Sequence, residues 1–205
     1  MTKNREFVSS CIVACAKRLP GWRKYGRRGL YRRTEDFVQW LHLEPSAFAA
    51  RTVPQYAVQA LAEQLPSVAL TLGDRVRDRR GVEFWFEPGD WDTRSSEILE
   101  SILEQIDPSG FEPLTPQAVI AFLERSGMDH VSAVATRGIA AIVAGSVDEG
   151  VHFLREAASW YGRMDIGWAR QNEAVVRSWL SASPDDLLSV LRHDAEKGAE
   201  LLHLK

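Results

Sequence analysis

Hydrophobic positions near the start of the chain recur at a helical spacing. They lie three or four residues apart, at Phe7, Val8, Cys11, Ile12 and Cys15. Side chains at this spacing share one face of a helix. A Pro-Gly pair at positions 20–21 ends the pattern, so we expect a helix over Lys3–Leu19.

The next apolar runs alternate as strands do. Phe37–Leu43 carries large apolar side chains at both odd and even positions, which is typical of a central strand covered on both faces. Thr34–Asp36 predicts a hairpin connection from a strand within Gly26–Arg33. Further strands are predicted over Gln55–Ala62, Val68–Leu72 and Val82–Phe86, although the alanines and glutamines of the first also suit a helix.

Beyond Thr93 the apolar spacing is helical only. Serine and threonine at positions 93–96 offer caps for a helix carrying Ile98 and Ile102, and Thr115 before Pro116 is a typical helix start. Further helices are predicted over 117–125, 131–144, 147–160, 166–181 and 184–202. Small residues at their interfaces permit close helix packing: Ala135, Ala140, Ala141, Ala157 and Ala158.

These elements predict an α+β fold. It consists of an N-terminal helix, an antiparallel sheet of four or five strands with a covering helix, and a C-terminal bundle of antiparallel helix pairs. We expect an α+β domain over 1–127 and helical hairpins over 128–205 packed on it. The length of 205 residues and the apolar share of 45% suffice for such a core without staples.

Two cysteines, Cys11 and Cys15, lie one helical turn apart. With no third cysteine for a metal site, they are interpreted as small buried apolar side chains of a reducing compartment. The apolar core of 7–16 is short and carries two serines, unlike a signal peptide, and no apolar run is long enough to span a membrane. We expect a soluble cytoplasmic protein.

The net charge of -3 conceals two blocks of opposite sign. The basic block lies between Lys3 and Arg33, where Glu6 is the sole acid: Lys3, Arg5, Lys17, Arg18, Arg23, Lys24, Arg27, Arg28, Arg32 and Arg33. The acidic block lies between Glu83 and Glu124, where Arg94 is the sole cation: Glu83, Glu87, Asp90, Asp92, Glu97, Glu100, Glu104, Asp107, Glu112 and Glu124. The blocks either face each other, within one domain or across a homodimer, or serve charged partners.

Aromatic residues alternate with cations between positions 22 and 33. The candidate partner-binding residues are Trp22, Arg23, Arg27, Arg28, Arg32 and Arg33. Such a segment can stack bases and contact phosphates, or its indoles can cover the sheet while arginines lie over the rings. The second reading is favoured because the chain as a whole is not basic.

The sequence lacks the phosphate-binding glycine loops, the nucleophile elbow and the zinc-protease motif. Its five histidines are scattered, and the acidic run from Glu83 to Asp92 has no recognised cation-binding spacing. We therefore expect no catalytic residue, cofactor or metal, and a protein that is not an enzyme.

One arrangement resembles a known family. A leading helix, Gly21-Trp22, the run Leu30-Tyr31-Arg32-Arg33 and the later Leu72-Gly73-Asp74-Arg75 are similar to the bacterial family catalogued as domain of unknown function 4304. The resemblance covers about the first 120 residues. It implies the fold of that part, no activity, and by analogy an immunity or accessory role.

Two residues of this pattern have structural interpretations. Gly73 suits a strand end with positive φ, and Arg75 is expected to pair with the acids near Asp90 and Asp92. Taken together, the sequence favours a non-enzymatic protein-binding module of the immunity or accessory type. The alternative is a nucleic-acid-binding protein that uses segment 22–33, and the protein partner is unidentified.

Overall fold

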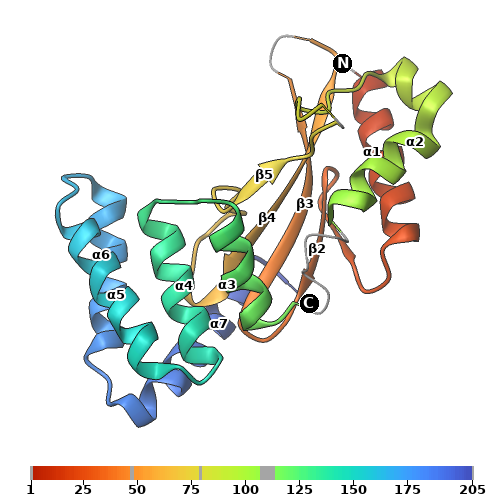
Figure 1. Ribbon diagram of the computed structural model, residues 1–205. Coiled ribbons are helices and arrows are strands. Elements are labelled where there is room, and N and C mark those ends of the chain that lie inside the picture. The colour runs from red at the N-terminus through yellow and green to blue at the C-terminus, as the bar shows by residue number, and fades with distance from the viewer. Residues whose placement is uncertain (1, 47–48, 79, 107–113, 205) are drawn as a thin grey trace. The chain divides into compact units, whose positions relative to one another are not determined.

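The computed structural model describes residues 2–46, 49–78, 80–106 and 114–204 (Figure 1). Its elements in chain order are α1 (Thr2–Arg18), β1 (Arg23–Tyr25), β2 (Gly29–Arg33), β3 (Phe37–Pro45), β4 (Thr52–Ala60), the 3₁₀ turn η1 (Leu61–Glu63), β5 (Gly73–Arg75), α2 (Pro88–Ile106), α3 (Pro116–Arg125), α4 (Val131–Val143), α5 (Val147–Gly162), α6 (Gly167–Leu180) and α7 (Pro184–Leu201). The predicted α+β class is confirmed.

The chain folds into two compact units, each discontinuous in sequence. The sheet unit comprises described residues within 1–32, 39–58 and 73–110, and the helical unit those within 33–38, 59–72 and 111–205. The two units alternate along the sequence, and β3 and β4 each contribute residues to both of them. The sequence predicts a different division, with one domain over 1–127 and helical hairpins over 128–205. That division stays a prediction.

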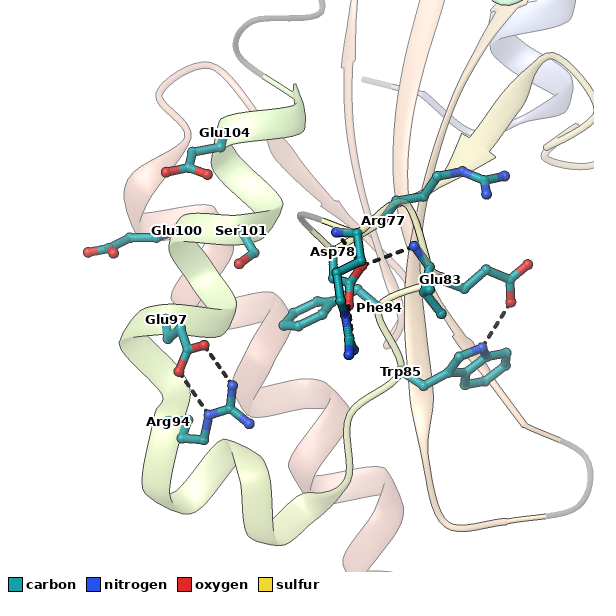
Figure 2. Close-up of a pocket in the computed structure, with 12 residues that line it drawn as sticks. Arg77, Asp78, Glu83, Phe84, Trp85, Arg94, Glu97, Glu100, Ser101 and Glu104 are labelled. Carbon is teal, nitrogen blue, oxygen red and sulfur yellow. Dashed lines mark hydrogen bonds and ion pairs between the residues drawn. The ribbon is translucent and has the colours of Figure 1, made fainter.

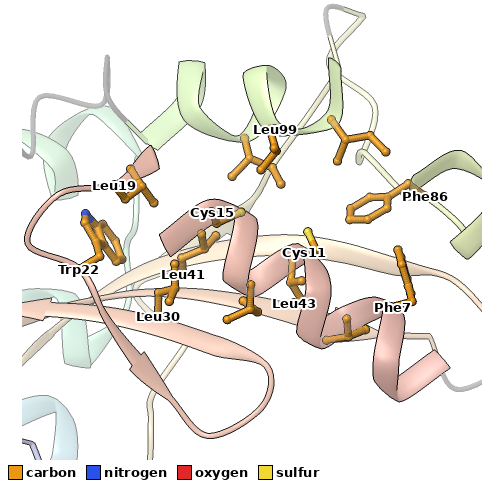
Figure 3. Close-up of a cluster of buried hydrophobic side chains, with 14 residues drawn as sticks. Phe7, Cys11, Cys15, Leu19, Trp22, Leu30, Leu41, Leu43, Phe86 and Leu99 are labelled. Carbon is orange, nitrogen blue, oxygen red and sulfur yellow. The ribbon is translucent and has the colours of Figure 1, made fainter. Parts of the chain in front are cut away.

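In the sheet unit, strands are ordered β1-β2-β3-β4-β5 and run antiparallel. The apolar stripe of α1 faces the strands, and α2 lies beside α1 (Figure 3). Their shared core comprises Phe7, Val8, Cys11, Ile12, Cys15, Leu19, Trp22, Leu30, Leu41, Leu43, Phe86, Ile98, Leu99 and Ile102. Burying each large side chain of this kind contributes about 1.5–3 kcal/mol, which is what fixes α1 against the sheet.

Both cysteines belong to this core, as predicted. Cys11 and Cys15 are free thiols with no exposed surface. The hydrogen bond with Cys15 and burial raise the pKa of the Cys11 thiol. They act as small apolar side chains on the face of α1 that contacts the sheet.

In the helical unit, α3 packs on α4, α4 on α5, and α5 on α6, while α7 packs on η1. The predicted small residues of α4 and α5 are buried. Gly150 allows α5 to lie close to α4, since a Cβ there would lie 2.7 Å from the Gly138 carbonyl oxygen. The predicted cap at Thr115 is present, and its hydroxyl accepts a hydrogen bond from the Ala118 N–H at 3.2 Å.

The structure contradicts two strand predictions and adds one strand. Val68–Leu72 is not a strand, and Val82–Phe86 forms only isolated bridges, from Glu83 to Arg77 and from Phe86 to Thr52. The strand expected within Gly26–Arg33 is β2, and it pairs with β1, which the sequence pattern did not indicate. An apolar run becomes a strand only where an unpaired neighbour is available, and that depends on residues distant in sequence.

The region before α2 and the role of Gly73 differ from expectation. Helical backbone already begins at Pro88, and a kink with non-helical angles at Arg94 separates this first part from the helix expected to start among residues 93–97. Gly73 is not among the glycines with positive φ. It is required by close approach, because a Cβ there would lie 2.0 Å from the carbonyl oxygen of Tyr56 on β4.

Candidate functional site

The candidate binding residues lie on the β1–β2 hairpin of the sheet unit. Arg23 pairs with Tyr31, Lys24 with Leu30, and Tyr25 with Gly29 in antiparallel register. Gly26 has a φ of +58°, a conformation that favours glycine, so it allows the tight turn between the strands. This turn places Arg27 and Arg28 at the exposed end of the hairpin.

Two of the predicted residues belong to the packing of the fold. The Trp22 side chain is buried beside Leu30 in the core (Figure 3). The Arg32 guanidinium lies 5.4 Å from the centre of the Trp22 ring, and its Nε donates to Gln39 Oε1 at 2.8 Å. The structural interpretation, an indole covering the sheet with an arginine over its face, is therefore confirmed for this pair.

The other predicted cations face solvent. Arg23, Arg27 and Arg28 are exposed, together with Lys24 of the same hairpin and Lys17 and Arg18 at the end of α1. We call these six side chains the basic surface. Arg33 is also exposed but belongs to the helical unit. The basic surface thus collects like charges that are adjacent along the chain and share one folded unit.

The basic surface combines like charges along one stretch of the chain. No acid interrupts the chain from Lys17 to Arg33. Burial and the positive charge of Arg28 lower the pKa of His42 on β3, and Glu44 offsets part of this shift. His42 therefore binds a proton less readily, first because it is buried and second because Arg28 is positively charged.

A cluster of aromatic rings forms part of the hairpin and of the strand beyond it. The Tyr25 ring lies 5.0 Å from that of Trp40 and 6.2 Å from that of Tyr31, in edge-to-face arrangements. Tyr31 and Trp40 are buried, and Tyr25 is half-buried. These rings hold the hairpin rigid, and neither Trp22 nor Tyr31 exposes a face on which a base can stack.

A second feature of the sheet unit is a groove of about 1010 Å³ between loop 77–85 and α2 (Figure 2). We call it the charged groove. Figure 2 shows Arg94, Glu97, Glu100 and Glu104 along α2 and Glu83 across from them. Among the described residues, three arginines and five carboxylates line it: Arg77, Arg80, Arg94, Asp78, Glu83, Glu97, Glu100 and Glu104. The described part of its lining is therefore acidic.

Ion pairs fix the arginine side chains around the groove. Arg94 pairs with Glu97 at 2.6 Å, and Arg80 with Asp78 at 2.9 Å. Arg75 pairs with Glu44 at 3.0 Å and with Glu83 at 2.8 Å, which corrects the expected pairing with Asp90 or Asp92. Each guanidinium is satisfied by carboxylates close to it in space.

The titration of the groove carboxylates suits binding more than proton transfer. The Val82 N–H, with help from Arg80, lowers the pKa of Asp78. The Arg75 and Trp85 side chains lower the pKa of Glu83 by donating hydrogen bonds to it. A general acid or base works best with a pKa near the operating pH, whereas these two groups remain anions.

Glu63 of the helical unit has a raised pKa, in contrast to Asp78 and Glu83. Burial raises its pKa to about 7, against the hydrogen bond that Thr136 donates to it. The adjoining cavity, lined by Tyr161, Asn172 and Trp179 among others, has a volume of about 10 Å³. A space of that size holds about one water molecule, so a substrate cannot reach Glu63 there.

The sequence pattern singled out the hairpin cations without deciding whether they face solvent, and it indicated neither the groove nor Glu63. The spacing of Glu97, Glu100 and Glu104 was a usable signal, because positions i, i+3 and i+7 lie on one helix face. Of the acidic run, Asp90 accepts a hydrogen bond from the Glu87 N–H at 2.8 Å. Within residues 2–46, 49–78, 80–106 and 114–204, no three His, Cys, Asp or Glu side chains gather as metal ligands would.

No helix in the described part of the chain is both long enough and apolar enough to cross a membrane. Comparison of the chain with family models, curated proteins and solved structures finds no match. The resemblance of the first 120 residues to the family of domain of unknown function 4304 stays a prediction.

Proposed function

We propose that this chain is a non-enzymatic protein-binding module that binds an acidic partner protein through its basic surface. The observation that carries the proposal is the exposure of six cations in a stretch of chain without acids, four of them on a hairpin that an aromatic cluster anchors to β3. A rigid surface of one sign steers an oppositely charged partner and selects against others. An immunity or accessory role is the biological form that we propose for it.

The burial of Trp22 and Tyr31 favours a protein partner over nucleic acid. Single-stranded nucleic acid is usually bound by exposed aromatic faces beside cations, and on this hairpin the cations are exposed while these two rings are not. Arginine pairs with carboxylates through two parallel hydrogen bonds, so acidic side chains of a protein are suitable ligands.

Nucleic acid remains the second candidate, because phosphates need only the cations. Binding to duplex phosphates weakens steeply with salt and does not depend on stacking. The six exposed cations of the basic surface are the observation that favours it.

The test is affinity capture from native lysate with the tagged full chain and two variants, each with and without nuclease. Arg27→Glu/Arg28→Glu reverses the charge at the hairpin turn. Arg155→Glu/Arg170→Glu makes the same charge change at exposed arginines of the helical unit. We expect one stoichiometric protein that survives nuclease, is captured by the control variant and is lost with the hairpin variant. Recovery of nucleic acid instead would promote the second candidate, and equal capture by both variants would overturn the role of the basic surface.

A further inference from the structure

The sheet unit carries a second charged surface, opposite in sign to the first. Glu97, Glu100 and Glu104 are exposed on one face of α2. Glu97 is paired with Arg94, whereas within the described residues no cation is paired with Glu100 or Glu104. The acids of α2 thus leave charge available to an outside cation.

The charged groove beside these acids also offers apolar contact. Val82 is 57% exposed, and Phe84 and Trp85 are half-buried along the loop that forms the opposite wall. Trp85 already has two guanidinium groups over its ring, with Arg51 at 4.9 Å and Arg75 at 5.6 Å from its centre. The surroundings of the groove therefore suit arginine both by charge and by its aromatic face.

The basic hairpin matches the groove in charge and in form. Its turn presents Arg27 and Arg28 as exposed side chains at one end of the β1–β2 edge of the sheet. Pockets that enclose small molecules commonly measure ~300–1,000 Å³, so the groove, at about 1010 Å³, has room for the arginine side chains of this turn. Arginines inserted beside Glu100 and Glu104 would form charge-assisted hydrogen bonds with carboxylates that no cation of the described residues pairs with.

We propose that the chain self-associates, with the β1–β2 hairpin of one copy seated in the charged groove of a second copy. The inference rests on the proposed function, since the same hairpin is the binding element, and it names a second copy of this chain as one acidic partner. The contact joins two different surfaces, the hairpin of one copy and the groove of the other. In a two-fold dimer this contact forms twice, so both surfaces of both copies are used and no further copy adds.

The test is the molar mass of the full chain, measured by light scattering after size exclusion and by sedimentation. We expect a mass above that of the monomer at ~100 μM, falling toward the monomer on dilution and in about 0.5 M NaCl, where exposed charges are screened. A monomer at every concentration in low salt would overturn the inference.

Charge reversal assigns the two surfaces. Arg27→Glu/Arg28→Glu and Glu100→Lys/Glu104→Lys should each be monomeric, because each brings like charges together. An equimolar mixture of these two variants should associate again, since each retains one native surface and the two reversed surfaces are complementary. The control Glu196→Lys/Glu200→Lys, at exposed acids of α7, should keep the wild-type mass. Failure of the mixture to associate would overturn the assignment.

The capture experiment separates this inference from the proposed function. A chain that is monomeric, yet loses a foreign acidic partner when the hairpin is reversed, retains the proposed function and contradicts self-association. A chain that self-associates through the hairpin and captures no other protein supports the self-association alone.

Discussion

At the scale of single residues, Glu63 shows how burial sets the ionisation of a carboxyl group. It lies in η1, and Thr136 Oγ1 on α4 donates a hydrogen bond to Glu63 Oε1 at 3.0 Å. Burial raises the pKa of Glu63 from 4.5 to about 7. Burial also raises the pKa of Tyr161, and the negative charge of Glu63 adds to that rise. The protonated carboxyl is thus the form that the helical unit favours near neutrality.

We predict that Glu63 makes the protein less stable as the pH rises through this interval. Below 4.5 both states hold the proton, and between 4.5 and about 7 the unfolded state loses it first. The free energy of unfolding therefore falls by up to ~3 kcal/mol across that window and stays lowered above it. The measurement is urea unfolding of wild type and Glu63→Gln at about pH 5 and about pH 8.

The glutamine variant should lose this contribution and be more stable than wild type at the higher pH. Glu200→Gln, an exposed site on α7, is the control and should keep the wild-type difference. Burial also raises the pKa of Asp36, which adds a slope of the same sign, so the comparison between variants isolates Glu63. A Glu63→Gln protein whose stability changes with pH as much as wild type contradicts the prediction.

Other residue-scale contacts depended on which side chains meet in space. Arg75 is paired with Glu44 of β3, far from it in sequence, instead of with Asp90 or Asp92. Trp179 Nε1 on α6 donates to the buried Asp194 of α7 at 2.9 Å. Such pairings cannot be derived from spacing, because each needs the packing of two separate segments.

At the scale of elements, the contact of α7 with η1 depends on a residue without a side chain. Gly198 lies against the backbone of Leu61, and a Cβ there would lie 1.9 Å from the Leu61 carbonyl oxygen. Helices otherwise disfavour glycine, which costs about 1 kcal/mol relative to alanine. Its presence in the last turn of α7 is explained by this close approach.

Gly198→Ala should therefore destabilise the protein, although alanine is the better helix former. We expect a loss of about 1–3 kcal/mol or more, because backbone must move to admit the methyl group. Gly167→Ala, in α6, is the matched control: a Cβ there meets open space, so it should be neutral or slightly stabilising. Denaturant midpoints of the two variants and wild type give the answer, and equal midpoints for both variants would refute the explanation.

At the scale of the whole molecule, the net charge of -3 is an average over regions of opposite sign. The basic surface carries six exposed cations, whereas the charged groove has five carboxylates to three arginines. A charged column or partner senses the local surface within about one Debye length, ~10 Å at 0.1 M salt. The average charge therefore underestimates the attraction for both anions and cations.

We predict that the protein at neutral pH and low salt is retained by both cation- and anion-exchange columns. Arg27→Glu/Arg28→Glu should elute from the cation exchanger at much lower salt, because it reverses two of the four hairpin charges of the basic surface. Arg155→Glu/Arg170→Glu changes the net charge by the same amount away from this surface and should shift the elution less. Identical shifts for the two variants would mean that net charge alone governs retention.

The sequence by itself determined the features that depend on neighbours within a few residues. These include the apolar stripe of α1 and its buried cysteines, the doubly covered strand at Phe37–Leu43, the cap at Thr115 and the small-residue interface of α4 and α5. Helix faces and caps form within one or two turns, so their signals are local.

Only the tertiary structure decided the rest. Val82–Phe86 alternates as a strand does, yet it makes only isolated bridges, whereas the three polar residues of β1 form a strand by pairing with β2. The interleaving of the two units, the partners of Arg75 and the acidic lining of the charged groove each join segments that are distant in the chain. The physical reason is that sheet pairing, close backbone approach and ion pairs depend on what lies opposite in space, which local spacing does not encode.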